Sequence, residues 1–105
     1  MDTYQQCQRD LTELAAALSS LGLWESSPPS SEALSSTEPF AIDTLSCSQW
    51  LQWIFIPRMG MLVENRLPLP SAMAISPYVE EALQGIDGHQ AIVAVTRNID
   101  RLFGE

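Results

Sequence analysis

An apolar segment in the middle of the chain, residues 50–63, limits the possible folds more than any other part of the sequence. Ser46 precedes it, and Gln49 follows three residues later, which is the spacing of a reciprocal helix cap. A helix is therefore expected to begin at Ser46 and to end at Asn65. Its apolar residues occupy every side, which predicts a central helix that is buried among its neighbours.

Two residues interrupt this apolar helix. Pro57 has no amide hydrogen and its ring crowds the carbonyl of Trp53, so a kink or a break is predicted near the middle. Arg58 is a cation among apolar neighbours, and an unpaired buried charge is very costly. We expect Arg58 to pair with a carboxylate, and Asp43 and Glu80 are the best candidates.

Three further helices are predicted around the central one, over residues 3–21, 76–85 and 88–103. Apolar residues recur at intervals of three and four in the first and the last, which places them on one helical face. Thr3 with Gln6 has the spacing of a capping box, and Gly22 that of a left-handed helix end. Ser76 is expected to cap the third helix, with Pro77 in its first position.

The predicted fold class is all-α, a single-domain bundle of about four helices with a buried, Pro-kinked central helix. No alternating strand pattern of useful length is found. At 105 residues the whole chain, 1–105, is expected to form one domain with one core. Residues 25–39 contain six serines and three prolines and are predicted to be a surface loop, in which 32–34 could form one helical turn.

The charge balance argues against some functions. Thirteen acidic residues face five arginines and no lysine, for a net charge of −8. Proteins that bind DNA or RNA rely on basic residues to neutralise phosphates, so direct nucleic-acid binding is not expected. The same charge repels anionic membranes and favours a basic protein partner. The polar run from Asp2 to Asp10 leaves no apolar region for a signal peptide, so we expect a cytoplasmic protein with Cys7 and Cys47 reduced.

The sequence does not contain a recognisable catalytic constellation, and we expect a non-catalytic protein without metal or cofactor. His89 is the single histidine, and its place near a helix start is typical of a surface residue. Cys7, Cys47 and His89 lack the spacing of metal ligands. Trp50 and Trp53 share a helical face and could stack on a nucleobase, although core packing explains them more simply.

The order of short motifs between residues 36 and 83 resembles the YqcC-like family of small bacterial proteins. These motifs are STEPF, DTL, WLQWIFIPRM, LPLP and PYVEEAL. The resemblance implies a compact all-helical fold. Members of that family are often encoded beside a tRNA pseudouridine synthase, which implies a role in supporting tRNA modification.

Two functions are expected from these observations. The first is an accessory or interaction protein that docks a partner, such as a tRNA-modifying enzyme, on a surface formed by PFAID, LPLP and PYVE. The second is a protein that binds a small anionic molecule, or a minor enzyme, with a pocket beside Arg58 that Gln52, Tyr78 and Glu80 also line. The candidate site residues are Phe40, Asp43, Gln52, Arg58, Pro68, Pro70, Tyr78 and Glu80.

Overall fold

The computed structural model describes residues 2–70 and 74–104, and all regular secondary structure in these two ranges is helical. The predicted all-α class is confirmed. The elements are α1 (Thr3–Ser20), α2 (Ser31–Leu34), η1 (Pro39–Ala41), α3 (Cys47–Trp50), η2 (Leu51–Phe55), α4 (Ile56–Glu64), α5 (Ser76–Ala82) and α6 (His89–Gly104).

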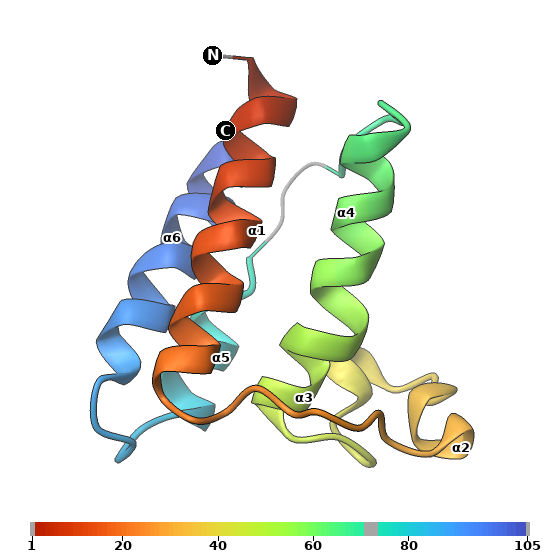
Figure 1. The fold of residues 1–105 in the computed structure, drawn as a ribbon, viewed down its shortest axis with the longest axis vertical. Helices are drawn as coiled ribbons and strands as arrows, with labels where there is room; N and C mark the ends of the chain where they lie inside the picture. The colour runs from red at the N-terminus through yellow and green to blue at the C-terminus, as the bar shows by residue number, and fades with distance from the viewer. Residues whose placement is uncertain (1, 71–73, 105) are drawn as a thin grey trace.

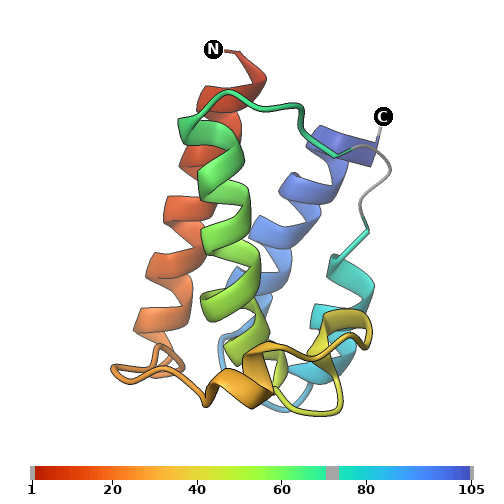
Figure 2. The same cartoon turned by 90° about the vertical axis from the view of Figure 1, so that its right-hand side faces the viewer.

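The long helices form an antiparallel arrangement with both chain ends at the same end of the molecule (Figure 1). Helix α1 lies beside α6 and also contacts α4, and α5 packs against α6. Viewed from the side, α4 stands in front of α1 and α6, while α5 lies next to the short elements at the base (Figure 2). In the ranges described, no helix is both long enough and apolar enough to cross a membrane.

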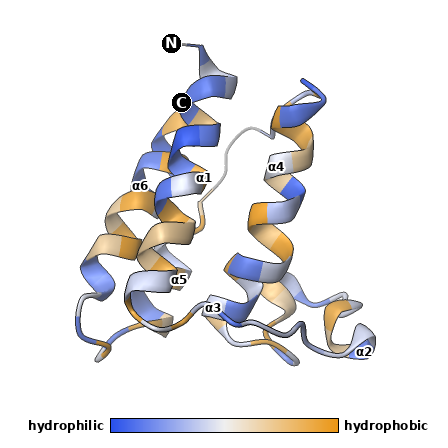
Figure 3. Ribbon diagram, in the orientation of Figure 1, coloured by the Kyte–Doolittle hydropathy of each residue, from blue (hydrophilic) through white to orange (hydrophobic). Residues whose placement is uncertain are grey.

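One hydrophobic core joins these helices. The largest fully buried side chains come from α1, η2, α5 and α6, and include Leu14, Leu18, Leu51, Ile92 and Ile99. The first turns of α1, near the N-terminus, are mainly hydrophilic (Figure 3). Cys7 on α1 and Ile99 and Phe103 on α6 carry the core towards the chain ends.

The N-terminal cap of α1 lies one residue earlier than the sequence suggested. The Asp2 carboxylate accepts a hydrogen bond from the Gln5 amide at 2.8 Å, and the Gln5 side chain accepts one from the Asp2 amide at 3.1 Å. The predicted Thr3–Gln6 pair was wrong, because the sequence offers two pairs in successive registers and a carboxylate is a good acceptor at a helix N-terminus. Gly22, with φ of 73°, ends the helix in the predicted left-handed conformation.

The central segment forms one continuous helical run from α3 through η2 to α4. Ser46 and Gln49 form the predicted capping box, and Asn65 ends the run. Residues Leu51–Phe55 form a π-helical turn, in which the Ile56 amide donates to the Leu51 carbonyl five residues earlier. Pro57 follows directly. The predicted kink or break therefore appears as a π-helical turn. This wider turn makes room for the ring of Pro57, which also has no amide hydrogen to donate.

Only part of this central run is buried. Leu51, Gln52, Phe55 and Met59 face the core, but the opposite side of α4 is open and leaves Met61 55% exposed. The prediction of a helix enclosed on all sides was wrong for its C-terminal half. The reason is geometrical: α4 packs on α1 along one face, and apolar composition does not determine how many neighbours a helix has.

The connection after α1 is tied to the central run by its backbone. The buried side chain of Gln52 accepts a hydrogen bond from the Glu25 amide and donates one to the Glu25 carbonyl, both at 2.7 Å. The Glu25 carboxylate in turn accepts from Trp53 Nε1 at 2.9 Å and from Gln49 Nε2 at 3.2 Å. The start of the predicted 25–39 loop is therefore fixed, and α2 is the single turn that the sequence allowed there.

Helix α5 receives its N-terminal cap from another helix. The Asp100 carboxylate on α6 accepts hydrogen bonds from the amides of Ile75 and Ser76, both at 2.8 Å. Ser76 makes no side-chain cap bond, so its predicted role was wrong, although Pro77 lies in the first turn as expected. Two partly exposed amides are satisfied by one carboxylate, which also fixes α5 against α6.

Candidate functional site

An apolar groove lies beside α4, lined by residues of the central helical run and of the segments before and after it. Its volume is about 460 Å³, which is within the usual range for ligand and peptide sites. Arg58 supplies the one charged side chain in its lining. The groove is lined by Phe40, Trp50, Phe55, Arg58, Met59, Leu62, Pro68, Leu69, Pro70 and Ile75.

Four aromatic rings form a continuous cluster, from which the groove takes three of its residues. Phe40 stacks on Tyr78 with ring centroids 4.4 Å apart and meets Trp50 edge-on at 5.0 Å. Trp50 then stacks on Phe55 at 5.3 Å. Such ring pairs add stability beyond the area they bury. The aromatic cluster (Phe40, Trp50, Phe55 and Tyr78) therefore gives the groove a rigid wall.

Phe40 holds its position in a strained backbone conformation. It has φ of 58° and Ala41 has φ of 48°, in the left-handed region that residues with side chains rarely adopt. Hydrogen bonds from Ala41 to Glu38 and from Leu45 to Ala41, at 2.9 and 2.8 Å, hold this tight turn. Strain of about 1–3 kcal/mol per residue persists only where the surroundings enforce it, and it is most common at binding sites.

Arg58 is exposed, and the ion pair predicted for it was wrong. Asp43 accepts a hydrogen bond from the Ser36 hydroxyl at 2.6 Å, and Glu80 pairs with Arg97 at 2.9 Å. Within residues 2–70 and 74–104, Arg58 makes no ion pair. Because it lies on the open side of α4, its charge is solvated and needs no buried partner.

Arg58 also lines a second, more polar hollow of about 470 Å³ that shares Phe40 and Trp50 with the groove. Glu38 lines the same hollow, so its charges are mixed. The Arg58 guanidinium therefore lies between the apolar groove and this hollow, and it can contact a group bound in either one. An arginine in this position can form a bidentate contact with a carboxylate or phosphate.

The structure brings half of the predicted site residues together. Phe40, Arg58, Pro68 and Pro70 line the groove, and Tyr78 supports it from behind through Phe40. The other three were wrongly placed. Gln52 is used for the Glu25 backbone, Asp43 for Ser36 and Glu80 for Arg97.

Six groove residues were not among the predicted site residues, and for three of these six the sequence contains a signal. Phe55, Met59 and Leu62 are spaced by four and three residues, so they share one face of the central helical run. That spacing is equally typical of core residues, and Met59 is indeed buried beneath the groove. Distinguishing a groove from the core required knowing where α4 has no neighbour.

The thiols of Cys7 and Cys47 are not activated. Burial is the main cause that raises the pKa of Cys7 to about 11 and that of Cys47 to about 12. Both thiols are free, and both are protonated at neutral pH, so neither is a ready nucleophile. His89 is half-buried, with Nδ1 3.0 Å from the Ile86 carbonyl. Over the described ranges, no group of three acidic, cysteine or histidine side chains is close enough to hold a metal ion.

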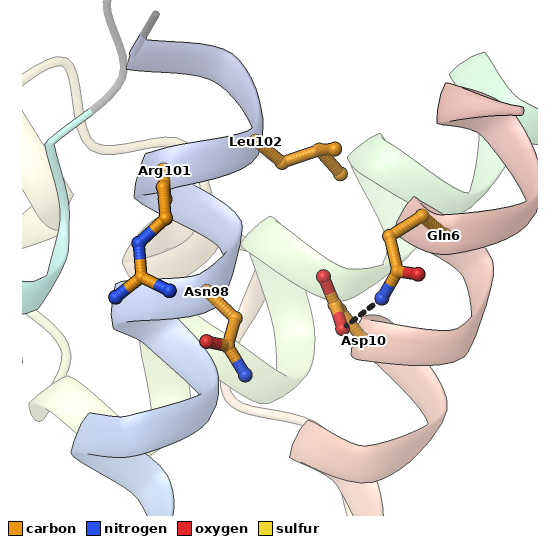
Figure 4. A pocket seen from close by; sticks show the side chains of 5 residues that line it. All are labelled: Gln6, Asp10, Asn98, Arg101 and Leu102. Carbon is orange, nitrogen blue, oxygen red and sulfur yellow. Dashed lines mark hydrogen bonds between the residues drawn. The ribbon is translucent and has the colours of Figure 1, made fainter.

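A third depression, the polar cleft, separates α1 from α6 near the chain ends and measures about 610 Å³. Gln6 and Asp10 contribute from α1, and Asn98, Arg101 and Leu102 from α6 (Figure 4). Asp10 is 2% exposed, and one of its oxygens accepts a hydrogen bond from Gln6 Nε2 at 3.0 Å. Its other oxygen, Oδ2, is buried without a hydrogen-bond partner among the described residues. Sequence patterns gave no reason to single out Asp10.

Replacing Asp10 with asparagine is expected to stabilise the protein at neutral pH. Desolvation raises the pKa of Asp10 above its ordinary 3.8 and Glu13 raises it further, while the bond from Gln6 and the charge of Arg9 lower it. The folded state therefore binds its proton more tightly than the unfolded state, so stability declines as pH rises through the raised pKa. Urea unfolding of both proteins should show Asp10→Asn more stable at pH 7, with the gap closing towards pH 3.8. An equal gap at both pH values would contradict this.

Comparison with known proteins gives a consistent result. The DUF446 family model, described as tRNA pseudouridine synthase C, matches residues 6–102. An uncharacterised Haemophilus influenzae protein is 46% identical over 88 residues, which is 84% of this chain and 83% of the relative. The uncharacterised protein YqcC of Escherichia coli is 37% identical over 106 residues, covering 100% of this chain and 97% of YqcC.

Two further matches concern structure and a longer protein. The solution NMR structure of Escherichia coli YqcC superposes with a TM-score of 0.85 at 38% identity, and the match covers 100% of this chain and 91% of that one. A Pectobacterium carotovorum protein named tRNA pseudouridine synthase C is 41% identical over 70 residues, which is 67% of this chain but 19% of that protein.

Proposed function

Since this chain belongs to the DUF446 family, to which its YqcC-like motifs also pointed, we propose that it is a non-catalytic accessory protein that docks a tRNA pseudouridine synthase through the apolar groove. The observation that carries the proposal is the groove itself: an open, largely apolar depression with a rigid aromatic wall and one exposed arginine. Sites of this composition suit a short apolar segment of a partner protein.

The residues that line the groove should lose little conformational entropy when a partner binds. The aromatic cluster is already packed, and two prolines restrict the backbone on the opposite wall. Arg58 would then select a partner segment that carries a carboxylate beside its apolar anchor. The net charge of −8 would favour approach of a partner that is basic elsewhere on its surface.

The Pectobacterium relative suggests which partner to test. There, a segment similar to this chain makes up 19% of a longer protein named tRNA pseudouridine synthase C. Two modules in one chain have a high effective concentration for each other, so a weak contact between them is sufficient. Where such a segment and the synthase are separate proteins, the corresponding contact would form between the two chains. Such a partner would place the protein in the cytoplasm, where the free thiols of Cys7 and Cys47 would remain reduced.

Leu62→Glu should abolish binding to the synthase of the same bacterium, whereas Met61→Glu should not. The two residues are neighbours on α4, but Leu62 lines the groove while Met61 is exposed outside its lining. Burying a new charge at an interface anchor costs about 2 kcal/mol or more, which is roughly 30-fold in affinity. Titration calorimetry with the purified synthase measures both. Equal affinities for the two variants, or no binding by the parent protein, would reject the proposal.

A second candidate function is favoured by Arg58 alone. An apolar groove with an unpaired guanidinium on its wall also suits a small anionic amphiphile. Thermal-shift screening against anionic metabolites separates the two functions. A ligand at 100 times its dissociation constant would stabilise the protein by about 2.7 kcal/mol, and Arg58→Met should remove most of that gain. If no anion stabilises the protein, this candidate is rejected.

A further inference from the structure

We infer that the polar cleft between α1 and α6 is a binding site for a small zwitterion of the amino-acid class, with its ammonium group held by Asp10 and its carboxylate held by Arg101. The site shares none of its lining residues with the apolar groove. The inference is therefore independent of the proposed docking function, and the two are tested by different ligands.

Asp10 is the proposed partner of the ammonium group. Its side chain is almost completely buried, yet one carboxylate oxygen has no hydrogen-bond partner in the described part of the chain. An unsatisfied buried acceptor costs about 1–3 kcal/mol, and more when it is charged. Because Asp10 lines the cleft, a group that enters there and displaces the atoms covering Oδ2 can supply the missing donor. An ammonium nitrogen supplies both hydrogen-bond donors and the opposite charge.

The composition of the cleft argues against a bare metal ion. Asp10 is the one carboxylate in the lining, and the other polar side chains are two amides and a guanidinium. Calcium and magnesium ions bind six or more oxygen ligands, usually with more than one carboxylate, and a neighbouring guanidinium would repel them. An organic cation is the better match.

Arg101 is the proposed partner of the carboxylate. It is exposed at the cleft and takes part in no ion pair among the described residues. A ligand that carried positive charge alone would meet this guanidinium at the same opening. A ligand with a carboxylate at its other end would instead find one complementary charge for each of its own. Asn98 lies between them on α6 and can donate to the carboxylate and accept from the ammonium (Figure 4).

The effect of Asp10 on stability also favours a binding role for the cleft. An amide or an apolar side chain at position 10 would avoid the cost of a desolvated charge, and α1 would pack against α6 without it. Residues that destabilise a fold at a surface depression are typical of binding sites, where function and stability conflict. The cleft volume of about 610 Å³ also leaves room for a small organic molecule.

The test uses L-alanine and its two halves as probes, with the full-length protein labelled with ¹⁵N. Ethylammonium represents alanine without the carboxylate, and propionate represents alanine without the ammonium group. We expect L-alanine to shift the backbone amide signals of Asp10, Asn98 and Arg101 in a saturable titration. Each half should bind about 10-fold more weakly or worse, because it leaves one charge of the site unpaired. Absence of a saturable shift, or equal binding by ethylammonium and alanine, would overturn the inference.

Variants distinguish a binding site from a structural defect. Asp10→Asn should fold with increased stability at pH 7 and yet bind L-alanine about 10-fold more weakly. Arg101→Met should lower the affinity for L-alanine. The thermal stability of the protein without ligand should not change. The matched control is Arg9→Met, because Arg9 is an exposed neighbour of Asp10 that pairs with Glu13 on the outer face of α1. Its alanine affinity should match that of the parent. If Asp10→Asn retains full affinity, the cleft is not the site.

Discussion

Asp100→Ala is expected to lower the free energy of unfolding by about 3–6 kcal/mol, since it removes two hydrogen bonds to a charged group and each contributes about 1.5–3 kcal/mol. The Asp100 carboxylate accepts from the amides of Ile75 and Ser76, both at 2.8 Å, and so caps α5 from α6. Without the Asp100 carboxylate, these two amides have no hydrogen-bond acceptor, and α5 is no longer held against α6. Urea unfolding followed by tryptophan fluorescence measures the change.

The matched control is Arg97→Ala, which removes another contact between the same two helices. Arg97 pairs with Glu80 at 2.9 Å, but both side chains are about half exposed. Exposed pairs contribute about 0–1 kcal/mol, so this variant should lose far less stability than Asp100→Ala. Asp100→Asn, which keeps one oxygen acceptor but loses the charge, should fall between the two. Equal losses for Asp100→Ala and Arg97→Ala would show that the cap has no special role.

Gln52→Met is expected to cost about 2–3 kcal/mol of folding stability. Methionine has a similar length but cannot replace the two 2.7 Å bonds that the Gln52 amide makes with the Glu25 backbone. Each bond contributes about 0.5–1.5 kcal/mol, and a partly buried group left unpaired adds to the loss. Urea unfolding measures the loss of stability. Faster hydrogen exchange at the Glu25 amide should accompany it.

Gln8→Met provides the comparison for this substitution. Gln8 is exposed on α1, and its side chain makes a single long contact of 3.4 Å with Thr12. Its replacement should change stability by no more than about 0.5 kcal/mol, as surface substitutions usually do. If Gln52→Met were equally mild, the connection after α1 would not depend on the Gln52 amide, and the tether would have to lie in the Glu25 carboxylate instead.

Local signals in the sequence were reliable where the structure they describe is local. Ser46 and Gln49 lie within one helical turn, so their spacing alone specifies the cap of α3. Gly22 adopts a positive φ at the end of α1 for a similarly local reason. At the start of α1 two overlapping signals competed, and a shift of one residue was enough to make the expected pair wrong.

Interactions between distant residues could not be read in the same way. Asp100 is 24 residues from Ser76, and Gln52 is 27 from Glu25, so no spacing rule connects either pair. Arg58 was expected to be buried because its neighbours are apolar, but the number of helices that pack around α4 decides its exposure. The groove also depends on packing, since it runs along the face of the central helical run that carries Phe55, Met59 and Leu62, at the edge of the core.

The amino-acid sequence by itself determined the all-helical class, most helix ends, the position of the irregular turn before Pro57 and four of the residues that line the groove. These depend on spacing within a few residues, on proline and glycine geometry and on recognisable short motifs. Only the tertiary structure decided which face of α4 is open, which acid caps α5 and that Asp10 is buried at a cleft. Each of these depends on how helices distant in the chain pack together, and packing is a property of the assembled fold.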